Sequence, residues 1–177
     1  MKEIRMHGRG GQGVVKSAQV IVQTVVGDHK YAHFIPFFGV ERKGSPVYGF
    51  LRLDDQDIRL KCQVYEPDIL MIFDDTLLSL PQTFDGFKAG GTIILNTCVN
   101  RQAVKLPTTA RRVALVDATG LALSRLGRNI PNTAMLGAFA KVCDQVNWES
   151  LKKQIAASFG EKNVEAAQAA YEAVAVS

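Results

Sequence analysis

The amino-acid sequence predicts one α/β domain with a largely parallel sheet and one inserted β-hairpin. Short apolar runs alternate with longer segments in which apolar residues recur every three or four positions, as in chains that alternate strands with helices. A glycine cluster stands between the first such run and the first helical pattern, as in the first half of a β-α-β unit. The length of 177 residues, with 47% hydrophobic side chains, suits a single domain spanning residues 1–177.

The N-terminal part of the chain predicts a strand, a tight loop, a helix and a second strand. Residues 3–7 alternate between polar and apolar side chains, which is typical of a strand. Apolar residues at helical spacing predict a helix over 12–26, which Gly27 and Asp28 end. The second strand is expected at 30–35.

The middle of the chain predicts a β-hairpin. Val47–Leu53 and Ile58–Tyr65 flank a turn rich in aspartate at 54–57, so we expect these two segments to pair with each other. Continuous apolar runs beyond the hairpin are typical of strands buried on both faces, and helical periodicity dominates the C-terminal part. The later elements are expected as strands at 68–73, 92–96 and 113–116, and as helices at 81–88, 119–126, 133–146, 149–159 and 161–174.

The net charge of +4 comes from basic residues in the second half of the chain. They concentrate between Arg101 and Arg128, where Asp117 is the only acid. Such a stretch could steer an anionic ligand or an acidic partner, and it could equally be a solvated face. No recognition motif accompanies it, so nucleic acid is not an expected partner. The basic residues are Arg101, Lys105, Arg111, Arg112, Arg125 and Arg128.

The cysteines and the hydropathy exclude several classes of protein. Cys62, Cys98 and Cys143 lie too far apart in the sequence to suggest a disulfide framework, a zinc site or an iron–sulfur site, so we expect reduced and mostly buried thiols. No apolar run approaches the roughly 20 residues that a membrane helix needs, and the N-terminus lacks the apolar core of a secretory signal. We therefore expect a cytoplasmic chain without a membrane partner or a metal site.

The glycine-rich loop after the first predicted strand is the main candidate binding site. Residues without Cβ let the backbone turn sharply and bring N–H groups, backed by a helix N-terminus, against an anion. A dinucleotide site also needs an acid after the second strand, and Phe34–Phe38 contains none. Another phosphate-bearing ligand, a partner's backbone and close packing of helix on sheet remain open as the purpose of the loop. The loop consists of Gly8, Arg9, Gly10, Gly11, Gln12 and Gly13.

Two further segments carry recognisable patterns. Adjacent aromatic residues precede a charged loop flanked by glycine, and such residues are costly to expose, which favours a partner interface unless the rings turn inward. The candidate interface residues are Phe37, Phe38, Glu41, Arg42 and Lys43. In Gly127–Ala138, Asn132 or Thr133 could cap the following helix, and Gly137 with Ala138 offers a small-residue face for close helix packing. The histidines His7, His29 and His33 show neither metal-ligand spacing nor a catalytic constellation.

Taken together, Gly8–Val15, Phe38–Val47 and Gly127–Ala138 resemble the gamma subunits of the pyruvate:ferredoxin, or 2-oxoacid:acceptor, oxidoreductases. The similarity spans about Ile4 to Lys141, and Ser45-Pro46-Val47 is similar to the pyruvate-type pattern. The resemblance implies a Rossmann-like domain with helices on both faces of a mostly parallel sheet. It also implies a role in converting pyruvate or a related, even aromatic, 2-oxo acid and coenzyme A to acyl-CoA and CO2, with reduction of ferredoxin or another acceptor.

The resemblance further implies a division of labour between subunits. Thiamine diphosphate and iron–sulfur clusters would belong to alpha, beta and ferredoxin-like delta partners, whereas this chain would bind no cofactor alone and be inactive alone. It would pack on the catalytic core near coenzyme A, with Gly8–Gly13 and Arg128 as the expected contacts. Two alternatives stay open at this point: a stand-alone dinucleotide-dependent oxidoreductase, and a scaffolding domain with a vestigial loop.

Overall fold

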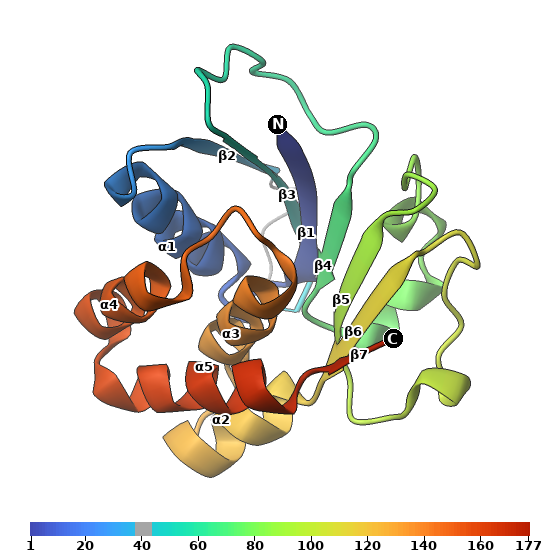
Figure 1. Ribbon diagram of the computed structural model, residues 1–177. Coiled ribbons are helices and arrows are strands. Elements are labelled where there is room, and N and C mark those ends of the chain that lie inside the picture. Colours follow the sequence, from blue (N-terminus) through green and yellow to red (C-terminus); the bar gives the residue numbers. More distant parts are fainter. Residues whose placement is uncertain (38–43) are drawn as a thin grey trace.

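A seven-stranded sheet runs through the protein, with the strand order β2-β3-β1-β4-β5-β6-β7 (Figure 1). The structure is a computed structural model, and it describes residues 1–37 and 44–177. The strands are β1 (Lys2–Arg9), β2 (Tyr31–Phe37), β3 (Pro46–Asp54), β4 (Ile69–Ile72), β5 (Thr92–Asn96), β6 (Arg112–Val116) and β7 (Ala175–Val176). The α-helices are α1 (Val14–Gly27), α2 (Ala118–Leu126), α3 (Asn132–Val142), α4 (Trp148–Phe159) and α5 (Glu161–Ala173). Short 3₁₀ helices are η1 (Asp75–Ser79), η2 (Pro81–Thr83) and η3 (Arg101–Ala103).

The predicted α/β class with a mostly parallel sheet is confirmed. Strands β1, β4, β5 and β6 pair in parallel with their neighbours in that series. Strand β3 is antiparallel to both β1 and β2, so β2 runs in the same direction as β1. Only β3 and β7 run the other way among the described strands.

Strand β1 lies where the winding of the sheet reverses. The chain leaves β1 through α1 toward the β2 edge, and β4, β5 and β6 extend to the other side of β1. In open α/β sheets, ligands bind outside the carboxyl ends of the strands at such a switch point. The fold thus places the glycine-rich loop, which follows β1, at the ligand-binding edge of the sheet.

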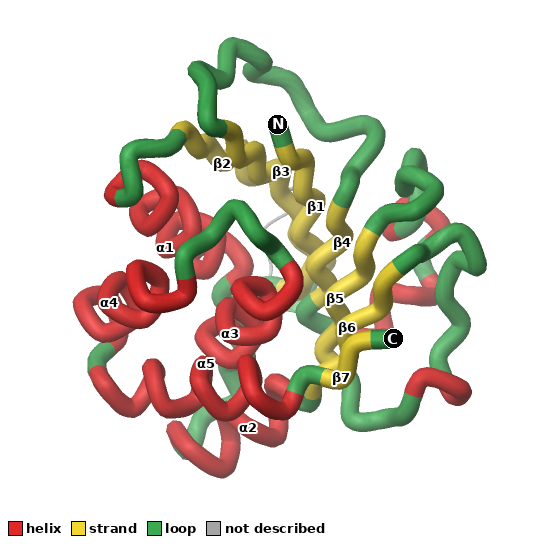
Figure 2. Tube along the Cα trace, viewed as in Figure 1, coloured by secondary structure: helices red, strands yellow, loops and turns green. Residues whose placement is uncertain are grey.

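Helical segments lie on both faces of the sheet, but unequally. Figure 2 shows α1 to α5 gathered on one side, and the main core lies there, with Ile4, Met6 and Met71 facing α1, α3 and α4. The other face carries a smaller core around Leu70, Ile72 and Leu95, which the 3₁₀ helices and loops cover. Successive side chains of β1 and β4 therefore point to opposite faces of the sheet, as in any strand, and on β4 they enter the two different cores.

Most predicted elements have a counterpart with small shifts at their ends, and two predictions were wrong. The predicted helix over 81–88 is only the 3₁₀ turn η2, because Gly86 takes a left-handed conformation with φ 67° that a helix cannot contain. The other wrong prediction is the hairpin between Val47–Leu53 and Ile58–Tyr65. The first segment is β3, but its antiparallel partners are β1 and β2, and 58–65 forms no strand.

Arg52 explains why the segment 58–65 is not a strand. This β3 side chain is 1% exposed. Its Nη1 donates to the backbone carbonyl of Cys62 at 2.6 Å, and its Nη2 donates to the carbonyl of Gln63 at 3.1 Å. Its Nε donates to Glu3 Oε1 at 2.9 Å. The carbonyls of this segment therefore satisfy a buried guanidinium instead of a neighbouring strand.

We expect Arg52→Met to destabilise the protein by about 3–5 kcal/mol, because the change leaves Glu3 and two carbonyls without their donor. Chemical denaturation followed by circular dichroism measures the free energy of unfolding. Arg59→Met is the matched control, since that side chain is 90% exposed and its ion pair with Asp57, at 3.5 Å, lies at the surface. Equal effects of the two changes would contradict the structural role of Arg52.

Candidate functional site

The glycine-rich loop turns sharply between the end of β1 and the start of α1. Gly11 and Gly13 have φ angles of 97° and 80°, a left-handed conformation that favours glycine. Gly13 is the N-cap residue of α1 and offers no side chain to the free N–H groups of the first turn. A Cβ on Gly13 would lie 2.9 Å from the Cβ of Asn132, so the loop packs directly on the start of α3.

Side chains that follow β4 hold this loop in place. The Arg9 backbone N–H donates to Gln12 Oε1 at 2.7 Å, and Gln12 Nε2 donates to Asp74 Oδ2 at 2.7 Å. Arg9 Nε lies 3.4 Å from the same carboxylate oxygen, and Arg9 Nη2 donates to Thr76 Oγ1 at 2.6 Å. Asp74 also caps η1. Burial raises the pKa of its carboxyl group, but hydrogen bonds from Thr76 and Gln12 help to bring it below its ordinary value.

The chain after the aromatic segment also pairs with the glycine-rich loop. Gly10 N donates to Ser45 O at 2.9 Å, and Gly44 N donates to Gly10 O at 3.2 Å. Arg9 Nη1 donates to Gly44 O at 3.1 Å. Arg9 and Gly10 therefore bind other parts of the protein, which makes them structural elements of the loop.

Only part of the predicted interface segment lies within the described residues. Phe38, Glu41, Arg42 and Lys43 lie outside the described residues. Phe37 ends β2, is 46% exposed and stacks on Tyr48 with ring centroids 4.6 Å apart. Its ring is therefore not turned into the core, and it remains a candidate contact for a partner.

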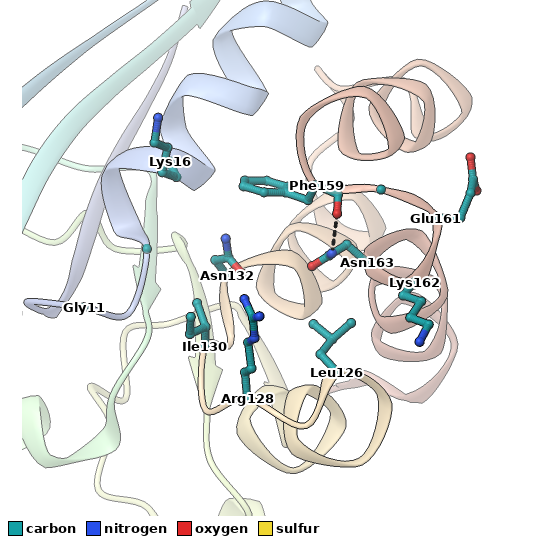
Figure 3. A pocket seen from close by; sticks show the side chains of 12 residues that line it. Gly11, Lys16, Leu126, Arg128, Ile130, Asn132, Phe159, Glu161, Lys162 and Asn163 are labelled. Carbon is teal, nitrogen blue, oxygen red and sulfur yellow. Dashed lines mark hydrogen bonds between the residues drawn. The ribbon is translucent and has the colours of Figure 1, made fainter.

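A pocket of about 670 Å³ opens beside the glycine-rich loop, and we call it the anion pocket (Figure 3). The N-terminal ends of α1, α3 and α5 meet there, each contributing lining residues from its cap or first turn. Three basic side chains, Lys16, Arg128 and Lys162, line it together with Glu161. The complete lining is Gly11, Gly13, Lys16, Leu126, Arg128, Ile130, Asn132, Phe159, Gly160, Glu161, Lys162 and Asn163.

Three helix N-termini and three basic side chains of the anion pocket favour a negatively charged ligand, and they are opposed by Glu161 and by the C-terminal ends of α2 and α4 at Leu126 and Phe159. Each helix N-terminus presents unpaired N–H groups and a partial positive charge. None of the three helix starts has a side-chain capping hydrogen bond. Lys16 and Lys162 lie in the first turns of α1 and α5, where a cation is unfavourable for the helix itself. A bound anion removes this repulsion and supplies acceptors for the N–H groups.

The structure separates the predicted site residues into two groups. Gly11, Gly13 and Arg128 line the anion pocket, although Arg128 is distant from the loop in sequence. Gly8, Arg9, Gly10 and Gln12 are not lining residues. A Cβ on Gly8 would collide with Val14 and approach the Cβ of Phe73 to 3.2 Å, so this glycine serves close packing of helix on sheet.

Sequence reasoning missed Lys16, Asn132, Phe159 and Lys162. The two lysines carried a usable signal, because cations in the first turn of a helix oppose its dipole. Asn132 was proposed as a cap, but α3 begins at Asn132 itself, with Pro131 in the N-cap position and no side-chain bond. Gly137 fulfils its predicted role, because a Cβ there would collide with the backbone of Ala167 in α5.

The basic stretch between Arg101 and Arg128 does not form one surface. Arg101 lies beside a hollow near the C-terminal ends of β5 and β6, whereas Arg112 lies at the opposite end of β6. Arg128 alone of these three reaches the anion pocket. The sequence pattern therefore identified one contact of the pocket and several separate surface charges.

The described residues contain no group of three or more His, Cys, Asp or Glu side chains arranged to hold a metal ion. All three cysteines are free, and the expectation of buried thiols holds only for Cys143, whose pKa burial raises to about 11. Cys62 and Cys98 are exposed. None of the described helices combines the length and hydropathy that crossing a bilayer requires.

Comparison with known proteins gives consistent matches over nearly the whole chain. The family model described as pyruvate ferredoxin/flavodoxin oxidoreductase matches residues 3–173. The chain is 46% identical over 177 residues to the pyruvate/ketoisovalerate oxidoreductases common subunit gamma of Thermococcus kodakarensis, covering 97% of this chain and 96% of the relative. It is 46% identical over 176 residues to pyruvate synthase subunit PorC of Methanothermobacter marburgensis, covering 97% of each.

Solved structures agree with these matches. The pyruvate oxidoreductase subunit PORC of Thermotoga maritima superposes with a TM-score of 0.88 at 34% identity, covering 99% of this chain and 98% of that chain. The 2-oxoglutarate:ferredoxin oxidoreductase of Magnetococcus marinus, solved with 2-oxoglutarate, coenzyme A and succinyl-CoA bound, superposes with a TM-score of 0.78 at 19% identity. The match covers 97% of this chain and 30% of that chain, and it shows a shared fold.

We expect Gly13→Ala to destabilise the protein by about 1–3 kcal/mol, because alanine is strained at a φ of 80° and its Cβ would press on Asn132. Thermal unfolding measures the loss. Gly27→Ala is the matched control at the other end of α1, where a Cβ meets nothing within 4 Å. If Gly13→Ala is as stable as Gly27→Ala, the described contact between the loop and α3 is wrong.

Proposed function

The chain belongs to the pyruvate ferredoxin/flavodoxin oxidoreductase family as a gamma subunit, and we propose that it helps such a complex to bind coenzyme A during oxidation of a 2-oxo acid. The substrate of the complex is pyruvate or a related 2-oxo acid. The bond between the carbonyl carbon and the carboxylate breaks, and CO2 leaves. The acyl group forms a thioester with the sulfur of coenzyme A, the thiol proton is released, and two electrons pass to ferredoxin or another acceptor.

Other subunits supply the redox cofactors in this proposal. Thiamine diphosphate, which activates the 2-oxo acid when bound, belongs to the alpha and beta partners, and iron–sulfur clusters belong to the beta and ferredoxin-like delta partners. The cysteines of this chain do not fit a cluster, since Cys143 is buried and Cys62 and Cys98 are exposed at separate places. The gamma chain therefore provides binding and positioning, with no residue in a catalytic role.

The observation that carries the proposal is the anion pocket. Coenzyme A bears several phosphate charges, and Lys16, Arg128 and Lys162 are among the residues that line a pocket at the starts of three helices. Arginine binds phosphate through paired N–H donors, and lysine acts as a point charge. Phe159 lines the same space and offers a ring face for the adenine of the nucleotide end (Figure 3).

The structure gives less support to a stand-alone dinucleotide-dependent enzyme. The switch point beside β1, where a dinucleotide would lie, is filled by the contacts of Arg9 and Gln12 with Asp74. The described part of β2 ends at Phe37 without a carboxylate for a ribose. The anion pocket lies instead between α1, α3 and α5, away from Arg9 and Asp74.

A tagged gamma chain expressed with its native partners is expected to co-purify with larger subunits that carry thiamine diphosphate and iron–sulfur absorbance. The purified complex should form acyl-CoA from pyruvate and coenzyme A, whereas the isolated chain should not. Native mass spectrometry and an assay of acyl-CoA formation measure both properties. Recovery of the chain only as a monomer, or turnover with NADH by the isolated chain, would contradict this function.

Arg128→Gln in the assembled complex is expected to raise the KM for coenzyme A by about tenfold, which is the loss of one charge-assisted contact to phosphate. The KM for pyruvate should stay unchanged. Lys153→Gln is the matched control, because Lys153 is exposed on α4 outside the pocket. An unchanged KM in Arg128→Gln together with normal assembly would favour the scaffolding alternative.

A further inference from the structure

A second pocket, of about 370 Å³, lies on the opposite face of the sheet from the anion pocket, and we call it the Arg5 pocket. Arg5 and His7 of β1 and Tyr48 of β3 form its sheet side. They alternate along the strands with residues of the main core such as Ile4 and Met6, which fixes the face to which they belong. Tyr65 and the turn after η2 provide the remaining walls.

Arg5 is a buried cation with an incomplete set of partners. The residue is 7% exposed. Its Nε donates to His7 Nε2 at 3.0 Å, and its Nη2 donates to the carbonyls of Thr83 at 3.1 Å and Asp85 at 2.6 Å. Its Nη1 donates to no atom of the described residues, and no salt bridge forms with a carboxylate among them. Among the described residues Nη1 therefore has no acceptor, and because it is not one of the buried unpaired atoms, its N–H groups are accessible to a ligand in the pocket.

The described neighbours of Arg5 offset its charge only in part. His7 accepts a hydrogen bond through Nε2, so it is neutral. Burial and, to a lesser extent, the charge of Arg5 lower its pKa to about 3. Burial lowers the pKa of Arg5, and the charges of Asp85 and Tyr48 oppose this effect without outweighing it. The guanidinium thus has a donor open to the pocket and no ion-paired carboxylate among the described residues, so the pocket is suited to an anion supplied from outside the chain.

The surroundings of the pocket indicate a macromolecular source for that anion. Tyr48 stacks on Phe37, which is 46% exposed, and packs edge-on against Phe50 with ring centroids 5.7 Å apart. Tyr65 is 65% exposed at the other side of the pocket. Exposed aromatic side chains around a buried arginine are the composition of the centre of a protein interface.

We propose that the Arg5 pocket receives an aspartate or glutamate side chain of a partner subunit, whose neighbouring apolar side chains cover Phe37, Tyr48 and Tyr65. The carboxylate accepts hydrogen bonds from Arg5 Nη1 and supplies the missing negative charge. This inference rests on the proposed function in one respect, namely that partner subunits exist. It adds the surface and the chemistry by which one of them docks, on the face of the sheet opposite the anion pocket.

Photo-cross-linking tests the occupant of the pocket in the assembled complex. With p-benzoylphenylalanine in place of Tyr65, irradiation and mass spectrometry should identify a peptide of a partner subunit that contains an aspartate or glutamate. A cross-link to a second gamma chain, to a partner peptide without an acid, or no cross-link in a complex that has assembled would overturn the proposal. Assembly itself tests the proposed function, so the two failures are distinguishable.

Arg5→Gln should weaken binding of the gamma chain to its partner by at least about tenfold, since truncating one member of a buried charge pair removes the contact and leaves the carboxylate unpaired. Arg59→Gln is the exposed control. Should Arg5→Gln fail to fold alone, Tyr65→Ala provides the same test, because this exposed ring contributes to the interface and not to the core. Unchanged affinity in a folded Arg5→Gln chain, or in Tyr65→Ala, would overturn the proposal.

Discussion

The position of β1 between an antiparallel and a parallel neighbour is the constraint on which both pockets depend. Strand β1 pairs with β3 along its whole length and with β4 in parallel, so its two faces and its end are fixed together. Its end places the glycine-rich loop at the switch point of the sheet. Its alternation sends Ile4 and Met6 to the helical side and Arg5 and His7 to the other side. One strand thereby positions the anion pocket and the Arg5 pocket on opposite faces.

Two buried arginines on adjacent strands have different roles: Arg52 stabilises the fold, whereas Arg5 is the proposed contact for a partner. Arg52 is enclosed by Glu3 and by carbonyls of the segment that follows β3, so its charge is matched within the chain. Arg5 has carbonyls and a neutral histidine as partners, and no carboxylate of the described residues forms an ion pair with it. A matched buried charge specifies the path of the chain, whereas an unmatched one is tolerated where a ligand or partner completes it.

The helix starts around the anion pocket are likewise unfavourable for the stability of the helices, and a bound anion would compensate them. Helices α1 and α5 carry lysines in their first turns, and α1, α3 and α5 begin without side-chain caps. Each of these choices weakens a helix taken by itself. Departures from the usual helix-start pattern are expected at functional sites, where a ligand compensates them. The first-turn lysines and the uncapped helix starts lie around one pocket, and together they support an anionic ligand more strongly than the glycine-rich loop does alone.

The sequence by itself determined the elements whose signal is local. The strand, glycine-rich loop and helix at the N-terminus follow from apolar periodicity and from glycine. Of the residues that line the anion pocket, Gly11 and Gly13 belong to that loop, and Arg128 belongs to the basic stretch of the sequence. Only the tertiary structure decided that β3 pairs with β1 and β2, that Arg52 binds the segment expected to be a strand, and that Lys16 and Lys162 line the same pocket. Strand partners and converging helix starts depend on contacts between residues far apart in the chain, and periodicity within one segment carries no information about them.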